Sequence, residues 1–116
     1  MTMKPIKAGV LMMLLALLAG CSNPLPEDRL DYAGEWQSKE MYLLILEDGT
    51  VAYKRLKNGG TTSINGPLKE FQGDNFLVGI GPLTTTFIVT KPPRQVNGQW
   101  QMEVDGVLLT KRNESI

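Results

Sequence analysis

The sequence predicts an all-β domain, a small antiparallel meander of about eight strands. One reason is that the apolar runs after residue 33 are four to seven residues long, which is the length of a strand. A second is that turn-forming pairs such as Asp48-Gly49 and Asp105-Gly106 separate these runs. A third is that no convincing helical period follows the leader, apart from one turn within 27–34.

The expected strands follow one another in chain order. They are residues 34–40, 41–47, 50–56, 61–64, 75–80, 83–90, 99–104 and 107–112, with 67–71 as a possible further short strand. The runs 61–64 and 67–71 are the weakest of these, and a turn is expected between them at Asn65-Gly66. Residues 91–98, KPPRQVNG, are expected to form a stiff proline loop that carries Lys91 and Arg94.

A closed barrel is the expected arrangement of this meander, because closure removes the exposed edges of an open sheet. Eight strands enclose an interior that side chains just fill, or that holds one small ligand. The aromatic residues expected inside are Trp36, Tyr53, Phe76, Phe87 and Trp100. Their bulk favours a filled interior, and a ligand-binding interior stays open as the alternative.

The first twenty residues have the layout of a secretory signal. Lys4 and Lys7 give a positive start, residues 8–19 are uncharged and apolar, and Ala19-Gly20 closes the run with small residues. The run is shorter than the roughly 20 apolar residues that a membrane-spanning helix needs. We therefore expect a signal helix at 1–20 that is removed from the mature protein.

Leu18-Ala19-Gly20-Cys21 resembles the lipobox of bacterial lipoproteins. The resemblance implies cleavage before Cys21, diacylglycerol on its sulfur and acylation of the new amino terminus. Several acyl chains anchor a protein stably, whereas one holds it only marginally. Residues 21–30 are then the lipidated cysteine and an extended tether, and 31–116 are the barrel domain. Ser22 is not the Asp associated with inner-membrane retention, so the resemblance implies the outer membrane, facing the periplasm, if the host has two membranes.

The segment Asp31-Tyr32-Ala33-Gly34-Glu35-Trp36 resembles the Gly-x-Trp opening of lipocalin-type barrels. In that family a helical turn precedes the first strand, and the Trp plugs the closed end of the barrel. The resemblance implies that a basic residue on the last strand, Lys111 or Arg112, packs over Trp36. It also implies a closed, lipocalin-like barrel.

The composition argues against several classes of function. The chain has no histidine and its single cysteine is expected to be lipidated, so we expect no metal site, no cofactor and no Ser-His or Cys-His catalysis. The carboxylates lie in turns or on solvent-facing positions without a defined pairing, so we expect no enzyme. Removal of Lys4 and Lys7 leaves ten basic against twelve acidic residues, a net charge of −2, which gives no footprint for nucleic acid.

These observations predict a lipid-anchored, non-catalytic accessory module of the cell envelope. Its expected contacts are the membrane, through Cys21, and an envelope protein or a cell-wall component. Lys91 and Arg94 are the candidate partner-binding residues, because prolines lower the entropy cost of presenting them. The alternative prediction is a carrier or sensor of a small apolar ligand inside the barrel.

Overall fold

The structure, a computed structural model, describes residues 24–112 of the chain. The predicted signal helix and Cys21 lie outside these described residues. Among the residues that are described, no helix has the length and apolar character needed to cross a bilayer.

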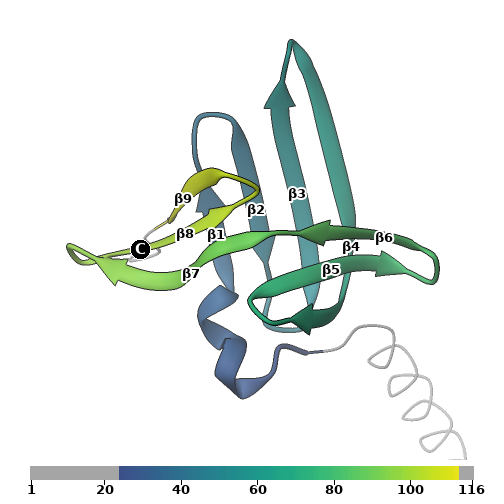
Figure 1. Cartoon of the computed structure of the whole chain (residues 1–116), viewed down its shortest axis with the longest axis horizontal. Helices are drawn as coiled ribbons and strands as arrows, with labels where there is room; N and C mark the ends of the chain where they lie inside the picture. The colour runs from purple at the N-terminus through teal and green to yellow at the C-terminus, as the bar shows by residue number, and fades with distance from the viewer. Residues whose placement is uncertain (1–23, 113–116) are drawn as a thin grey trace, which may run out of the picture.

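A single antiparallel sheet of nine strands makes up almost all of the domain (Figure 1). The strands are β1 (Gly34–Gln37), β2 (Met41–Ile45), β3 (Thr50–Lys57), β4 (Gly60–Gln72), β5 (Asn75–Ile80), β6 (Leu83–Phe87), β7 (Val89–Val96), β8 (Gln99–Val104) and β9 (Val107–Lys111). A short 3-10 helix, η1 (Glu27–Tyr32), precedes them. The predicted all-β antiparallel meander is therefore confirmed.

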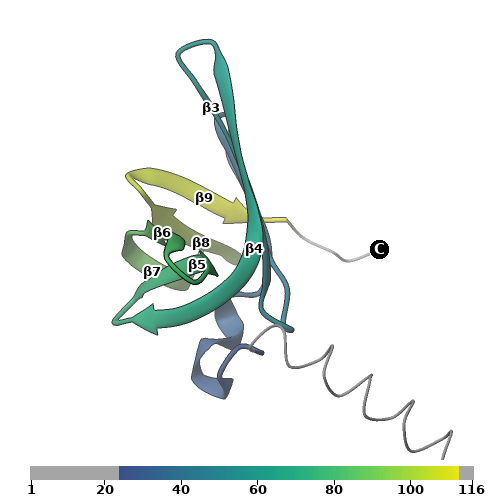
Figure 2. The same ribbon diagram turned by 90° about the vertical axis from the view of Figure 1, so that its right-hand side faces the viewer.

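The sheet curls into a half-barrel, as the side view in Figure 2 shows. Its hydrogen-bonded order is β6-β5-β4-β3-β2-β1-β9-β8-β7, so β1 and β9 pair while β6 and β7 form the two edges. These edge strands are consecutive in the chain and are separated by Ile88 alone. The complete closure expected of a barrel is not confirmed, because no ladder joins β6 to β7 within residues 24–112.

At Ile88 the chain changes the strand with which it pairs. The backbone N–H of Ile88 donates to Asp105 Oδ1 at 3.0 Å, and the N–H of Asp105 donates to the Ile88 carbonyl at 2.8 Å. The next residue, Val89, donates its N–H to Asn75 Oδ1 at 2.7 Å, on the side of β5. Consequently β6 pairs with β5, whereas β7 pairs with β8 on the opposite side.

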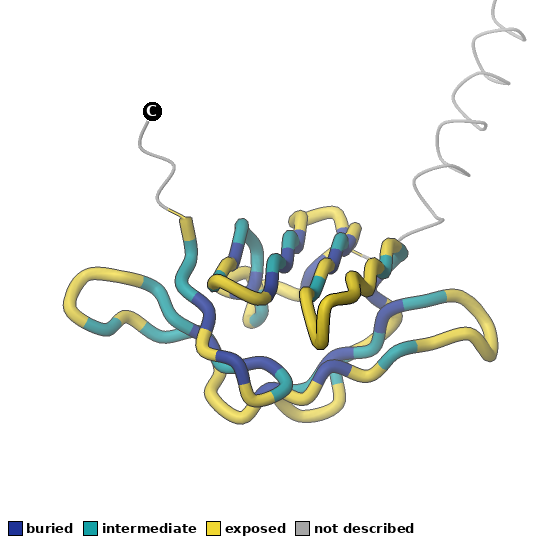
Figure 3. The backbone as a smooth tube through the Cα atoms, turned by 90° about the horizontal axis from the view of Figure 1, so that it is seen from above, coloured by how far each residue is buried: buried dark blue, intermediate teal, exposed yellow. Residues whose placement is uncertain are grey.

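The core lies on the concave face of the curled sheet, and the hairpin loops are exposed (Figure 3). Its buried members are Leu25, Tyr32, Trp36, Met41, Leu43, Ile45, Val51, Tyr53, Leu68, Phe76, Val78, Phe87, Val89, Met102, Val104, Val107 and Leu109. Strand alternation predicted most of this set, because residues two apart point to one face. Trp36 is fully buried as expected, but Trp100 is only half-buried at the margin of the core.

Residues 61–71 form one strand rather than two. Strand β4 runs without interruption through Asn65-Gly66, which pair with Ala52 and Val51 of β3. The hairpin turn lies earlier, at Asn58-Gly59, where both residues have the positive φ that such a turn requires. The expected turn at Asn65-Gly66 was wrong because the long pairing with β3 outweighs local turn preference.

The proline-containing stretch is also a strand and not the expected loop. Strand β7 includes Pro92 and Pro93 and pairs with β8 through register shifts between Val89 and Lys91 and between Lys91 and Arg94. Proline is tolerated on an edge strand and at bulges, since there it need not donate a ladder hydrogen bond. The prediction of a loop with basic residues at its tip is therefore wrong.

Candidate functional site

A cluster of aromatic and charged side chains lies where β1 begins and β9 ends. Trp36 Nε1 donates to the Tyr32 carbonyl at 2.8 Å. Lys111 Nζ lies 4.9 Å from the centroid of the Trp36 ring and 5.0 Å from that of Trp100, and donates to the Asp31 carbonyl at 3.2 Å. The prediction that a basic residue of the last strand packs over Trp36 is thus confirmed for Lys111.

The local structure explains why residue 34, in the Gly-x-Trp segment, is a glycine. Gly34 has φ +138°, a conformation that side chains rarely adopt. A Cβ atom at this position would lie 3.0 Å from Lys111 Cε, so a side chain here would press against the lysine stem. Glycine therefore allows Lys111 to cross β1 and reach the Trp36 ring.

Arg112, the other basic residue considered for this role, lies elsewhere. Its guanidinium is 3.9 Å from Glu35 Oε2, and its backbone N–H donates to the Glu35 carbonyl at 2.7 Å. Tyr42 donates its hydroxyl to the same Glu35 oxygen at 2.9 Å. Desolvation, followed by this hydrogen bond to Glu35, raises the pKa of Tyr42 above its ordinary value.

An open groove of about 550 Å³ lies at this end of the sheet, between the ends of β1, β2 and β9 and the turn before β8. Its apolar lining includes Leu44, Leu46 and Trp100, and its charged lining includes Glu47 and Lys111. The groove therefore combines apolar surface with charges of both signs, which suits an amphipathic ligand better than a purely apolar one.

The N-terminal segment of the described chain is packed against the sheet. Leu25 is 7% exposed and donates its N–H to the Glu47 carbonyl at 3.0 Å. Within η1, Arg29 donates to the Gly73 carbonyl at 2.8 Å. Residues 24–30 consequently belong to the folded domain, and the extended tether expected there is not observed.

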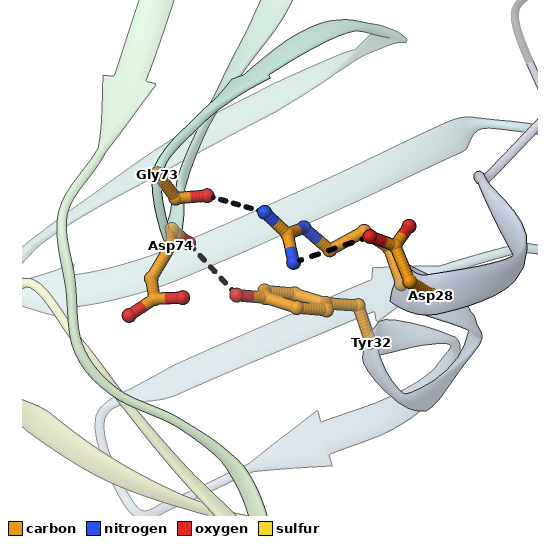
Figure 4. A network of polar contacts seen from close by, with 5 residues as sticks. Asp28, Tyr32, Gly73 and Asp74 are labelled. Carbon is orange, nitrogen blue, oxygen red and sulfur yellow. Dashed lines mark hydrogen bonds and ion pairs between the residues drawn. The ribbon is translucent and has the colours of Figure 1, made fainter.

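Tyr32 completes this attachment at the other end of η1. Its hydroxyl donates to the Asp74 carbonyl at 2.9 Å (Figure 4), and its ring makes an edge contact with Phe71, 5.0 Å between centroids. Burial, together with the nearby negative charge of Asp74, raises the pKa of Tyr32 to about 12. The neutral phenol is therefore the form that the folded protein favours.

The two predicted partner-binding residues do not form a shared basic tip. Lys91 is 56% exposed and lies 3.8 Å from Glu103 Oε1 across the β7–β8 ladder. Arg94 is half-buried, and its Nη1 has no hydrogen-bond partner among the described residues. Cys21, the predicted lipidation site, lies outside the described residues.

The groove beside Lys111 was not foreseen from the sequence. The sequence offered only a partial signal, the expected contact of Lys111 or Arg112 with Trp36. The structure adds that Lys111 also lies beside Trp100 on β8. Among residues 24–112, no group of three or more Cys, Asp or Glu residues could hold a metal ion. Comparisons with family models, with curated proteins and with solved structures found no match to this chain.

Proposed function

We propose that this chain is a lipid-anchored, non-catalytic accessory protein of the cell envelope that acts by contact at a membrane surface. The acyl anchor is on Cys21, and in a host with two membranes the protein lies on the outer membrane and faces the periplasm. Its partner is an envelope protein or a cell-wall component, and nucleic acid is not a partner. The lipobox residues Leu18 to Cys21 are the sequence feature behind the anchor.

The observation that carries this proposal is the packing of Leu25 on the sheet. Leu25, which is hydrogen-bonded to Glu47 of the sheet, lies only four residues after Cys21 in the sequence. Four extended residues span at most about 14 Å. An acylated Cys21 would therefore hold η1 and the β2–β3 turn next to the lipid headgroups, which suits a protein that works at the membrane surface.

The anchor is tested by metabolic labelling with a clickable fatty acid. Cys21→Ser should abolish labelling and leave uncleaved precursor, because serine offers no sulfur for the thioether. Ser22→Ala, the neighbouring substitution, is the control and should label like the parent. Equal labelling of the Cys21→Ser variant would overturn the anchor.

Partner contact through β7 is tested separately. Lys91→Ala combined with Arg94→Ala should weaken recovery of crosslinked envelope partners while shifting stability by less than about 1 kcal/mol. The control is Lys54→Ala combined with Lys57→Ala, which removes the same charge from the exposed β3–β4 hairpin. If both double variants recover partners as well as the parent, β7 is not the contact surface.

The groove beside Trp100 favours a second candidate function, the binding of a small amphipathic ligand. Trp36, Phe76 and Phe87 are all buried in the core, and their bulk favours this groove over the core as a ligand site. A long-chain fatty acid is the matching probe, since its chain would meet Leu44 and Leu46 and its carboxylate would meet Lys111. Fluorescence titration should then show binding that Trp100→Ala weakens, and an equal affinity in this variant would refute the site.

A further inference from the structure

The free edge of β6 differs from the rest of the surface in its exposed apolar side chains. Ile80 and Leu83, which pair across the β5–β6 hairpin, are 73% and 82% exposed, the highest values among the large hydrophobic residues described. Ile88, at the other end of β6, is 45% exposed. No strand pairs with the outer side of β6 within residues 24–112. A strand edge of this kind is a template for pairing with another chain.

The turn geometry fixes which backbone groups face this open edge. Gly81 has φ +58° and Pro82 can only take a negative φ, so the two-residue turn is of type II′ and Leu83 is hydrogen-bonded to Ile80. Antiparallel ladders alternate, so Thr85 also faces β5, whereas the N–H and C=O groups of Thr84 and Thr86 face outward. The contacts of Ile88 with Asp105, on the side away from β5, fit the same alternation.

The sequence of β6, Leu-Thr-Thr-Thr-Phe, has residues of the same kind on both sides of Thr85: a threonine next to it and a large apolar residue at each end. Antiparallel pairing with an identical strand, centred on Thr85, brings the outward groups of Thr84 opposite those of Thr86 of the second copy. This register uses every outward backbone group of β6. Thr85 then faces Thr85 of the second copy, and such threonine pairs are favourable across strands.

The same pairing covers apolar surface and separates like charges. It places the exposed Leu83 opposite Phe87 of the second copy, on the concave face of both sheets. Strand β6 has no charged residue, so its own side chains add no charge repulsion to the contact. Lys69, whose Nζ donates to the Gly81 carbonyl at 3.3 Å, lies at the hairpin tip, and the two-fold axis puts the two tips at opposite ends.

From these observations we propose that the protein forms a symmetric dimer by antiparallel pairing of two β6 strands, centred on Thr85. The two half-barrels are then joined edge to edge, and the second copy supplies the strand that each β6 lacks. The inference does not rest on the proposed function, because it uses only the described edge and neither the anchor nor the groove.

Oxidative crosslinking of the full chain, purified in detergent, tests the register. Thr85→Cys should form a covalent dimer of twice the chain mass, because a non-hydrogen-bonded pair brings the two Cα atoms to about 4.5 Å. Thr90→Cys, an exposed threonine on β7, is the matched control, and the parent chain reports any crosslinking through Cys21 itself. Equal crosslinking at positions 85 and 90, none at 85, or a product containing a different protein would each overturn the proposal.

A second variant tests the backbone contact itself. Thr86→Pro removes an N–H that faces the open edge and therefore leaves the ladder with β5 intact. Its dimer dissociation constant, measured by analytical ultracentrifugation, should rise by at least about tenfold, with circular dichroism unchanged. A folded Thr86→Pro variant that dimerises like the parent would refute the proposal. If this variant does not fold, the Thr85→Cys crosslink decides alone.

Discussion

Strands β6 and β7 are consecutive halves of one run of chain, yet the two sheet edges that they form are opposites in character. The edge of β7 carries Lys91, Pro92, Pro93 and Arg94, is interrupted by two register shifts, and has η1 lying against it. The edge of β6 has neither charge nor proline and pairs with β5 in continuous register.

Charges, prolines and bulges are the devices that block edge-to-edge association in natural sheets. All of them occur on β7, and none occurs on β6. Both edges belong to the same sheet and are separated by Ile88 alone, so the fold as a whole does not explain the difference. The comparison indicates that β7 is built to stay unpaired, whereas β6 is suited to a strand from another chain.

The largest expected effect concerns the packing beneath the two edges. Phe87 of β6 stacks on Phe76 at 5.1 Å between ring centroids and meets the Tyr53 ring at 4.9 Å. Phe87→Ala should therefore lower the free energy of unfolding by about 3 to 5 kcal/mol. Trp100→Ala, on the β7 side, should cost about half as much, because this side chain is only half-buried. Urea unfolding measures both, and a larger loss for Trp100→Ala would reverse this comparison.

The next largest effect is a difference in stability cost between alanine substitutions in the β5–β6 hairpin and in the β7–β8 hairpin. A Cβ atom at Gly79 in the β5–β6 hairpin would lie 2.1 Å from the Leu83 carbonyl oxygen, and Gly79 has φ +139°. Gly79→Ala should cost on the order of 3 kcal/mol. Gly98→Ala in the β7–β8 hairpin, where φ is +82° but no atom lies within 4 Å, should cost only about 1 to 2 kcal/mol. Similar losses in thermal unfolding would show that close backbone approach does not distinguish the hairpins.

A smaller effect tests, through its pH dependence, how the η1 segment is attached to the β4–β5 hairpin on the β6 side of the sheet. The pKa of Tyr32 is about 12 in the folded protein and about 10 when unfolded. A raised pKa means that the stabilisation is complete below pH 10 and is lost as the pH rises towards about 12. The parent should lose stability across this window more steeply than Tyr32→Phe, as chemical unfolding at several pH values would show. Parallel pH profiles for the two proteins would contradict the role of the Tyr32 phenol.

The smallest effect on stability comes from removing the protection of β7. Pro92→Val combined with Pro93→Val should change the free energy of unfolding by less than about 1 kcal/mol, since both prolines lie on an edge strand. The variant should nevertheless associate into species larger than a dimer, because prolines then no longer block pairing at β7 and the chain has a second edge that can pair. Light scattering measures this, and Thr86→Pro in the same chain should reduce the size of the assemblies. An unchanged particle size in the double variant would show that prolines do not protect β7.

Much of the fold could be predicted because alternation is a local property of the chain. The pattern of Trp36, Met102 and Val104 assigned inward-facing positions that the structure confirms, and Asp105-Gly106 marked its hairpin correctly. The prediction was wrong where neighbours in space overruled local preference. Pairing with β3 carried β4 straight through Asn65-Gly66, and pairing with β8 drew Pro92 and Pro93 into an edge strand.

For the candidate site too, local sequence features could be predicted and the contacts between distant strands could not. The sequence by itself determined the all-β class and the inward position of Trp36, and the resemblance to lipocalin-type barrels implied the contact of a basic residue from the last strand with its ring. Only the tertiary structure decided that Lys111 makes this contact, that Leu25 is already part of the folded domain, and that β6 and β7 end the sheet. The physical reason is that alternation and turn chemistry are set by residues close in sequence, whereas edges and grooves depend on which strands lack a neighbour.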